Sequence, residues 1–65
     1  MKKKELKSLA KRIAEAELII QNSTDKKEIN DAKNMIMELS NHAIDLEDML
    51  ALDEMVQDIL SQHNS

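Results

Sequence analysis

The chain has 65 residues, contains no Gly, Pro, Cys, Phe, Trp or Tyr, and carries a formal net charge of −4. These absences exclude disulfides and thiolate metal sites, and they remove the residues that β-sheets use for tight turns and aromatic-rich strands. The sequence therefore predicts an all-α protein of one domain over residues 1–65, and the acidic balance argues against a dedicated nucleic-acid-binding protein.

The first helix is expected over about residues 3–21. Apolar residues recur there in steps of three and four, which places them on one face of a helix. They are Leu6, Leu9, Ile13, Ala16 and Ile20. Ala10, Ala14 and Ile19 widen this face, which favours a core-facing helix over a narrow coiled-coil seam. The polar run 21–24 then interrupts the pattern.

The second helix is expected over about residues 26–40. Asp25 and Glu28 have the spacing of a capping box, in which each side chain satisfies a backbone N–H at the helix start. The apolar residues that follow keep a regular spacing of three and four, through Ile29, Ala32, Ile36, Leu39, Ala43, Leu46 and Leu50. Asn41 is the best candidate for a left-handed C-terminal cap in a chain without Gly.

The third helix is expected over about residues 45–61, because the apolar register fails at Asp53. The apolar set then shifts to Met49, Leu52, Val56 and Ile59, with Met55 and Leu60 beside it. Three carboxylates near the expected start favour a helix N-terminus there, at Asp45, Glu47 and Asp48. Ile44 and Met49 have the spacing of a hydrophobic staple around Asp45. The polar tail from Gln62 is expected to fray.

Two architectures are compatible with this pattern. The first is a small three-helix bundle with a chain reversal near residues 40–45. The alternative is a helical hairpin whose second helix runs unbroken from Asp25 to about Ser61, so that half of it would be covered by a second chain in a dimeric four-helix bundle.

Few residues are candidates for chemistry. Glu38, His42 and Asp45 would share one side of an unbroken helix, but helical metal sites recruit ligands from several helices, so we expect no metal and no cofactor. The sequence has no nucleophile paired with a histidine and no Gly-rich phosphate loop. We therefore expect no catalytic residues and a protein that is not an enzyme.

The start of the chain is strongly basic. Residues 1–12 hold six cations against the single carboxylate of Glu5, and the cations are Lys2, Lys3, Lys4, Lys7, Lys11 and Arg12. This segment supports an alternative hypothesis of an accessory nucleic-acid-binding protein. The acidic residues of the third helix are expected to lie near it and to offset part of the charge, and the chain lacks aromatic residues for base stacking.

The apolar excess of the last helix is the most suggestive feature. Its apolar residues extend over more than half of the helix circumference, and a soluble monomer usually leaves such excess exposed at an interaction site. The expected function is protein–protein interaction, regulatory or structural, through self-association as a homodimer or through another helical protein. The expected partner-binding residues are Met49, Leu52, Met55, Val56 and Ile59. No membrane span or signal peptide is evident, so a cytoplasmic location is expected.

Overall fold

Three α-helices make up the fold, and the lack of Gly and Pro lets each helix run without an internal break. The computed structural model describes residues 2–43 and 45–64. In chain order the helices are α1 (Lys3–Asn22), α2 (Lys26–Ser40) and α3 (Leu46–Asn64). The expected all-α class and the three-helix arrangement are confirmed, and the long-hairpin alternative is wrong because the chain turns between α2 and α3.

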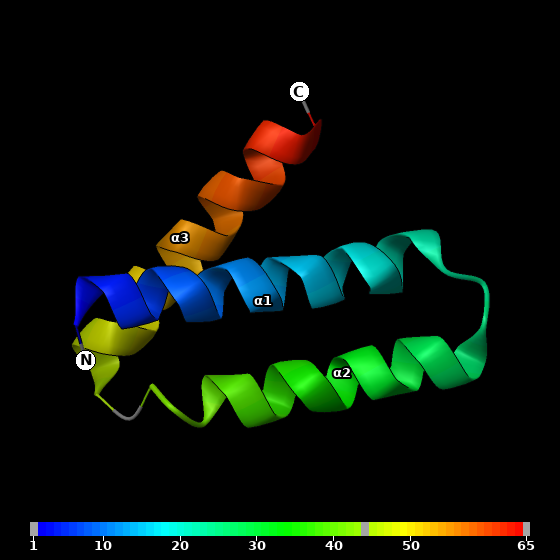
Figure 1. Ribbon diagram of the computed structural model, residues 1–65, viewed down its shortest axis with the longest axis horizontal. Coiled ribbons are helices and arrows are strands. Elements are labelled where there is room, and N and C mark those ends of the chain that lie inside the picture. The colour runs from blue at the N-terminus through cyan, green and yellow to red at the C-terminus, as the bar shows by residue number, and fades with distance from the viewer. Residues whose placement is uncertain (1, 44, 65) are drawn as a thin grey trace.

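α1 is the central helix because its apolar face is broad enough to pack against both other helices. Ala10, Ala14 and Ala16 are fully enclosed, and their small side chains allow close approach of the neighbouring backbones. α2 runs back alongside α1, whereas α3 crosses behind α1 obliquely (Figure 1). Among the described residues, α2 and α3 have little contact with each other.

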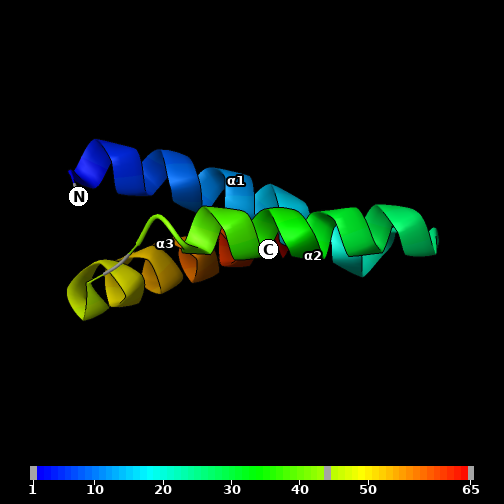
Figure 2. The ribbon, with the colours of Figure 1, turned by 90° about the horizontal axis from the view of Figure 1, so that it is seen from below.

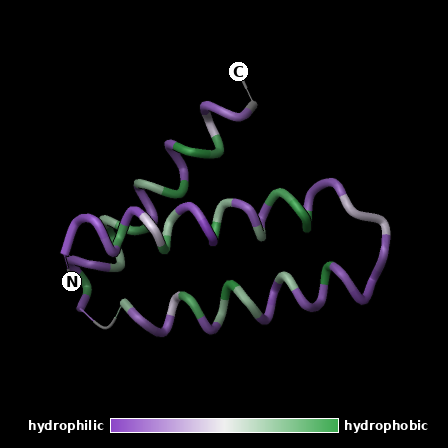
Figure 3. The backbone as a smooth tube through the Cα atoms, viewed as in Figure 1, coloured by the Kyte–Doolittle hydropathy of each residue, from purple (hydrophilic) through white to green (hydrophobic). Residues whose placement is uncertain are grey.

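The core is thin. The molecule measures 34 × 27 × 16 Å, and polar and apolar residues alternate along all three helices (Figure 3). No large side chain in the described part of the chain is completely enclosed. The main cluster of buried residues contains Leu6, Ala10, Ile13, Ala14, Leu39, Ala43, Leu52, Val56 and Leu60. Because α1 supplies packing for both neighbours, each helix keeps a side that no other helix covers.

The turn between α1 and α2 is held by side-chain hydrogen bonds. The Asp25 carboxylate accepts the Lys27 N–H at 3.0 Å, so Asp25 is the N-cap that the sequence predicts. Glu28 does not complete the expected capping box directly. Instead, the Ser23 hydroxyl links Glu28 to the backbone of Asp25. Its Oγ accepts the Asp25 N–H at 3.2 Å and donates to Glu28 Oε2 at 3.2 Å.

The turn between α2 and α3 differs from the expected one. Asn41 has φ −66° and ψ −15°, so the prediction of a left-handed cap is wrong, and no described residue has a positive φ. The N–H groups of His42 and Ala43 instead donate to the carbonyls of Leu39 and Ser40, three residues earlier, at 3.2 and 3.1 Å. These hydrogen bonds, each spanning three residues, give the carbonyls at the end of α2 their partners without a left-handed residue.

The start of α3 is one residue later than expected. The Met49 N–H donates to the Asp45 carbonyl at 3.0 Å, so Asp45 precedes the first helical residue, Leu46. The partner in the expected hydrophobic staple, Ile44, lies outside the described residues. α3 continues to Asn64 rather than to Ser61, because no Gly or Pro interrupts it and the buried Leu60 anchors the turn before its last residues.

Candidate interaction surface

Two of the five predicted partner-binding residues lie in the core. Leu52 and Val56 are 5% and 3% exposed and pack in the cluster built on α1, so their side chains offer no free surface. Met55 and Ile59 are half-buried against the same cluster. Met49 is 50% exposed. A partner-binding role stays a prediction, and of the five residues Met49 has the side chain best placed for it.

The exposed apolar residues of α3 lie mostly before the predicted set. Leu46 is 72% exposed and Leu50 is 63% exposed. With Met49 they occupy positions i, i+3 and i+4 of the helix, so their side chains form one continuous patch, here called the α3 stripe. Asp53 follows one turn later on the same side. Among the described residues, the α3 stripe holds three of the six large apolar side chains that are exposed.

α2 contributes two further exposed apolar side chains. Met37 is 66% exposed and Met35 is 40% exposed. Met35 and Met37 each stand one residue from Ile36, which lines the notch described next, so they lie on opposite flanks of that side of α2.

A notch lies between α2 and α3, with residues of α1 on its third side. Its lining residues are Ile13, Glu17, Ile36, Ser40, Ala43, Met49, Leu52, Asp53 and Val56. Its volume is about 180 Å³, which is below the several hundred Å³ typical of small-molecule sites. The two ribbon views together show that α3 diverges from α2 after the turn (Figures 1 and 2), and the notch is not fully enclosed. Its size suits one protruding side chain better than a buried ligand.

A second groove runs between α1 and α3 on the opposite side of α3. Lys3 and Lys7 from α1 share it with Glu54 and Asp58 from α3. The basic start of the chain therefore lies beside acidic residues of the third helix, as expected, and Glu54 and Asp58 are the ones that share this groove. Met55 and Ile59 form the apolar part of this groove.

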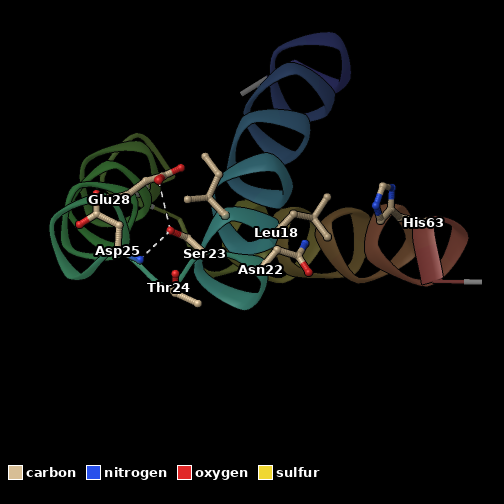
Figure 4. Close-up of a pocket in the computed structure, with 8 residues that line it drawn as sticks. Leu18, Asn22, Ser23, Thr24, Asp25, Glu28 and His63 are labelled. Carbon is tan, nitrogen blue, oxygen red and sulfur yellow. Dashed lines mark hydrogen bonds between the residues drawn. The ribbon is translucent and has the colours of Figure 1, made fainter.

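A third hollow lies where α1 meets α2, and it brings a serine, an aspartate and a histidine near one opening (Figure 4). The Ser23 hydroxyl donates to Glu28 and accepts from the backbone of Asp25. His63 lies on α3, and in Figure 4 Leu18 stands between His63 and Ser23. The hydroxyl thus serves the turn before α2, and its donated hydrogen bond goes to a carboxylate rather than to an imidazole base.

The candidate metal ligands are not aligned on one helix. α2 ends at Ser40, which places Glu38 inside the helix and His42 and Asp45 beyond it. The described residues contain no group of three His, Cys, Asp or Glu side chains arranged to hold a metal ion. Within residues 2–43 and 45–64, no helix has the length and apolar character needed to cross a membrane.

The fold and the surfaces define a class: a small all-α protein in which a central helix packs against two others and the last helix leaves large apolar side chains exposed. No protein-family model, curated protein or solved structure matches the chain.

Proposed function

We propose that the protein is a non-enzymatic interaction protein that self-associates as a homodimer through the α3 stripe, formed by Leu46, Met49 and Leu50. The observation that carries the proposal is that three large apolar side chains, 50–72% exposed, lie side by side at the start of one helix. Isolated exposed apolar residues are common on soluble proteins, but a contiguous patch usually marks an interaction site.

A symmetric dimer would place the α3 stripe of one copy against the same stripe of the other, since a two-fold interface uses one patch twice. Burying each of these partly exposed side chains contributes about 1–2 kcal/mol. Six such side chains across the interface contribute about 6–12 kcal/mol, which is comparable with the roughly 4–15 kcal/mol that association costs. A weak dimer is expected, sensitive to any single side chain in the stripe.

Charge gives this dimer a distinctive salt dependence. Residues 34–65 contain no Lys or Arg, and their acidic residues are Glu38, Asp45, Glu47, Asp48, Asp53, Glu54 and Asp58. A stripe-to-stripe contact would bring Asp53 of each copy close to the other copy's acidic helix. Salt screens this repulsion, so raising the ionic strength should strengthen the dimer.

The test compares two substitutions by light scattering with refractive-index detection, which needs no aromatic chromophore. Leu50→Glu introduces a charge into the α3 stripe and should leave the protein monomeric. Ile19→Glu is the matched control, because Ile19 is an apolar residue, 38% exposed, near the end of α1. That variant should dimerise like the unmodified chain. If the Leu50→Glu protein still dimerises, the α3 stripe is not the interface. If the Ile19→Glu protein fails to dimerise, the loss of dimer is not specific to the stripe.

A second candidate function is accessory nucleic-acid binding through the start of α1. The exposure of all six cations in residues 2–12 favours this function. The carboxylates of Glu54 and Asp58 argue against it, because they share a groove with Lys3 and Lys7 and offset part of the positive charge. Retention on heparin or duplex DNA at about 150 mM salt would support it, and no retention even at low salt would end it.

A further inference from the structure

Methionine is the residue type of this chain that mild oxidants attack. The sequence contains five methionines and neither cysteine nor any aromatic residue, so no thiol or indole competes for an oxidant. Oxidation converts the apolar thioether of methionine into a polar sulfoxide. The exposure and the position of each methionine therefore decide where oxidation occurs and which surface it changes.

Met49 combines an accessible side chain with a place in the α3 stripe. It is 50% exposed, and it lies one turn after Leu46 and next to Leu50 on the same side of α3. It does not belong to the main buried cluster, whereas Met55, on the same helix, packs against that cluster and is half-buried. Oxidation of Met49 therefore changes the proposed interface and leaves the core intact.

We propose that oxidation of Met49 by a hydroperoxide disrupts the self-association proposed above, on which this inference rests. The sulfur lone pair forms a bond to one peroxide oxygen, the O–O bond breaks, and a proton moves to the departing oxygen, which leaves as water or an alcohol. Sulfur loses two electrons and the peroxide gains them. An uncharged oxidant suits this position, because the carboxylates of Glu47, Asp48 and Asp53 repel anions. A methionine sulfoxide reductase with a thiol reductant reverses the step.

The sulfoxide weakens the dimer because its oxygen loses hydrogen bonds to water when an apolar interface covers it. A two-fold contact contains Met49 from both copies, so the penalty applies twice in each dimer. The stripe has only three large apolar side chains in each copy, and the dimer they form is weak. We expect oxidation to raise the Kd of the dimer at least about tenfold.

Dimerisation and oxidation oppose each other at Met49. The dimer covers the sulfur, so the oxidant reaches it in the monomer, and the effect of each process on the other is reciprocal. Raising the protein concentration should therefore slow the oxidation of Met49. Met35 is the internal control, because it is 40% exposed and lies about 140° around α2 from Ser40, which lines the notch together with Met49. Its oxidation rate should be the same at every concentration.

The first experiment treats the full chain with hydrogen peroxide and locates the added oxygen by mass spectrometry. Cleavage after glutamate places Met35, Met49 and Met55 in three different peptides, and fragmentation distinguishes Met35 from Met37 within one of them. In dilute protein, Met49 should be oxidised faster than the half-buried Met55. In concentrated protein, the rate at Met49 should fall and the rate at Met35 should not.

The second experiment measures the mass of three variants by light scattering before and after a brief peroxide treatment. Met49→Leu keeps an apolar side chain without sulfur, so it should dimerise under both conditions. Met49→Gln carries a polar side chain from the start and should stay monomeric under both. Met35→Leu is the matched control, and it should dimerise before treatment and lose the dimer afterwards, like the unmodified chain. Treatment with the reductase should restore the dimer of the unmodified chain.

The proposal holds if peroxide weakens the dimer of the unmodified chain at least about tenfold and leaves that of Met49→Leu unchanged. It is overturned if peroxide leaves the unmodified dimer as strong as before, if Met49→Leu loses its dimer as well, or if high protein concentration protects Met35 as much as Met49. Failure of the homodimer itself gives a different result, in which the unoxidised chain and Met49→Leu both stay monomeric at every concentration, and that result ends both proposals.

Discussion

Shortening Leu52 to alanine tests whether this residue belongs to the core or to a partner surface. Leu52 is 5% exposed and packs in the cluster around α1, so Leu52→Ala should lose about 2–4 kcal/mol of unfolding free energy through lost burial and the cavity left behind. A single core of this size rarely supplies more than about 3–5 kcal/mol. The substitution should therefore remove most of the stability of the fold.

Met49→Ala is the matched comparison, because Met49 lies one turn earlier on α3 and is 50% exposed. It should cost about 1 kcal/mol. Urea unfolding of dilute protein, followed by circular dichroism at about 222 nm, measures both values in the monomer. With a slope of about 1 kcal/mol per molar urea, the midpoint for Leu52→Ala should fall by about 2 M or more, or its helical signal should be reduced before urea is added. Equal midpoints for the two variants would refute the packing of α3 against α1.

Two further predictions concern the turns. Asp25→Ala removes the acceptor for the Lys27 N–H and should cost about 1 kcal/mol of unfolding free energy by the same urea assay, and an unchanged midpoint would show that the cap does not stabilise α2. Asn41→Gly, which would stabilise a left-handed cap, should instead lower stability by about 0.5–1 kcal/mol, because Asn41 has a right-handed helical backbone and glycine adds entropy to the unfolded chain. A stabilised Asn41→Gly protein would contradict the observed geometry of the turn.

The helices could be predicted closely because their limits depend on local chemistry. The three- and four-residue spacing of apolar side chains defines α1, and the Asp25 cap defines the start of α2. The handedness of the second turn could not be predicted, because Asn tolerates both the left-handed and the right-handed region and the hydrogen bonds of His42 and Ala43 depend on how the turn packs.

The exposed surface was harder to predict than the helices. Leu46 and Leu50 continue the apolar spacing of α2, and that continuity suggests a shared buried face. Periodicity shows which residues share a face of one helix, but the direction of that face changes when the chain turns. After the turn between α2 and α3, the face with Leu52 and Val56 points to α1, and Leu46 and Leu50 become exposed.

The start of α3 carries an exposed apolar surface, and we propose that a second copy of the chain covers it. Sedimentation equilibrium with interference optics, over protein concentrations from about 10 μM to 1 mM and at low and high salt, tests it most directly. The average mass should rise from 7.4 kDa toward twice that value as concentration increases, and the rise should begin at lower concentration in high salt. A mass that stays at 7.4 kDa under every condition would contradict self-association through the α3 stripe.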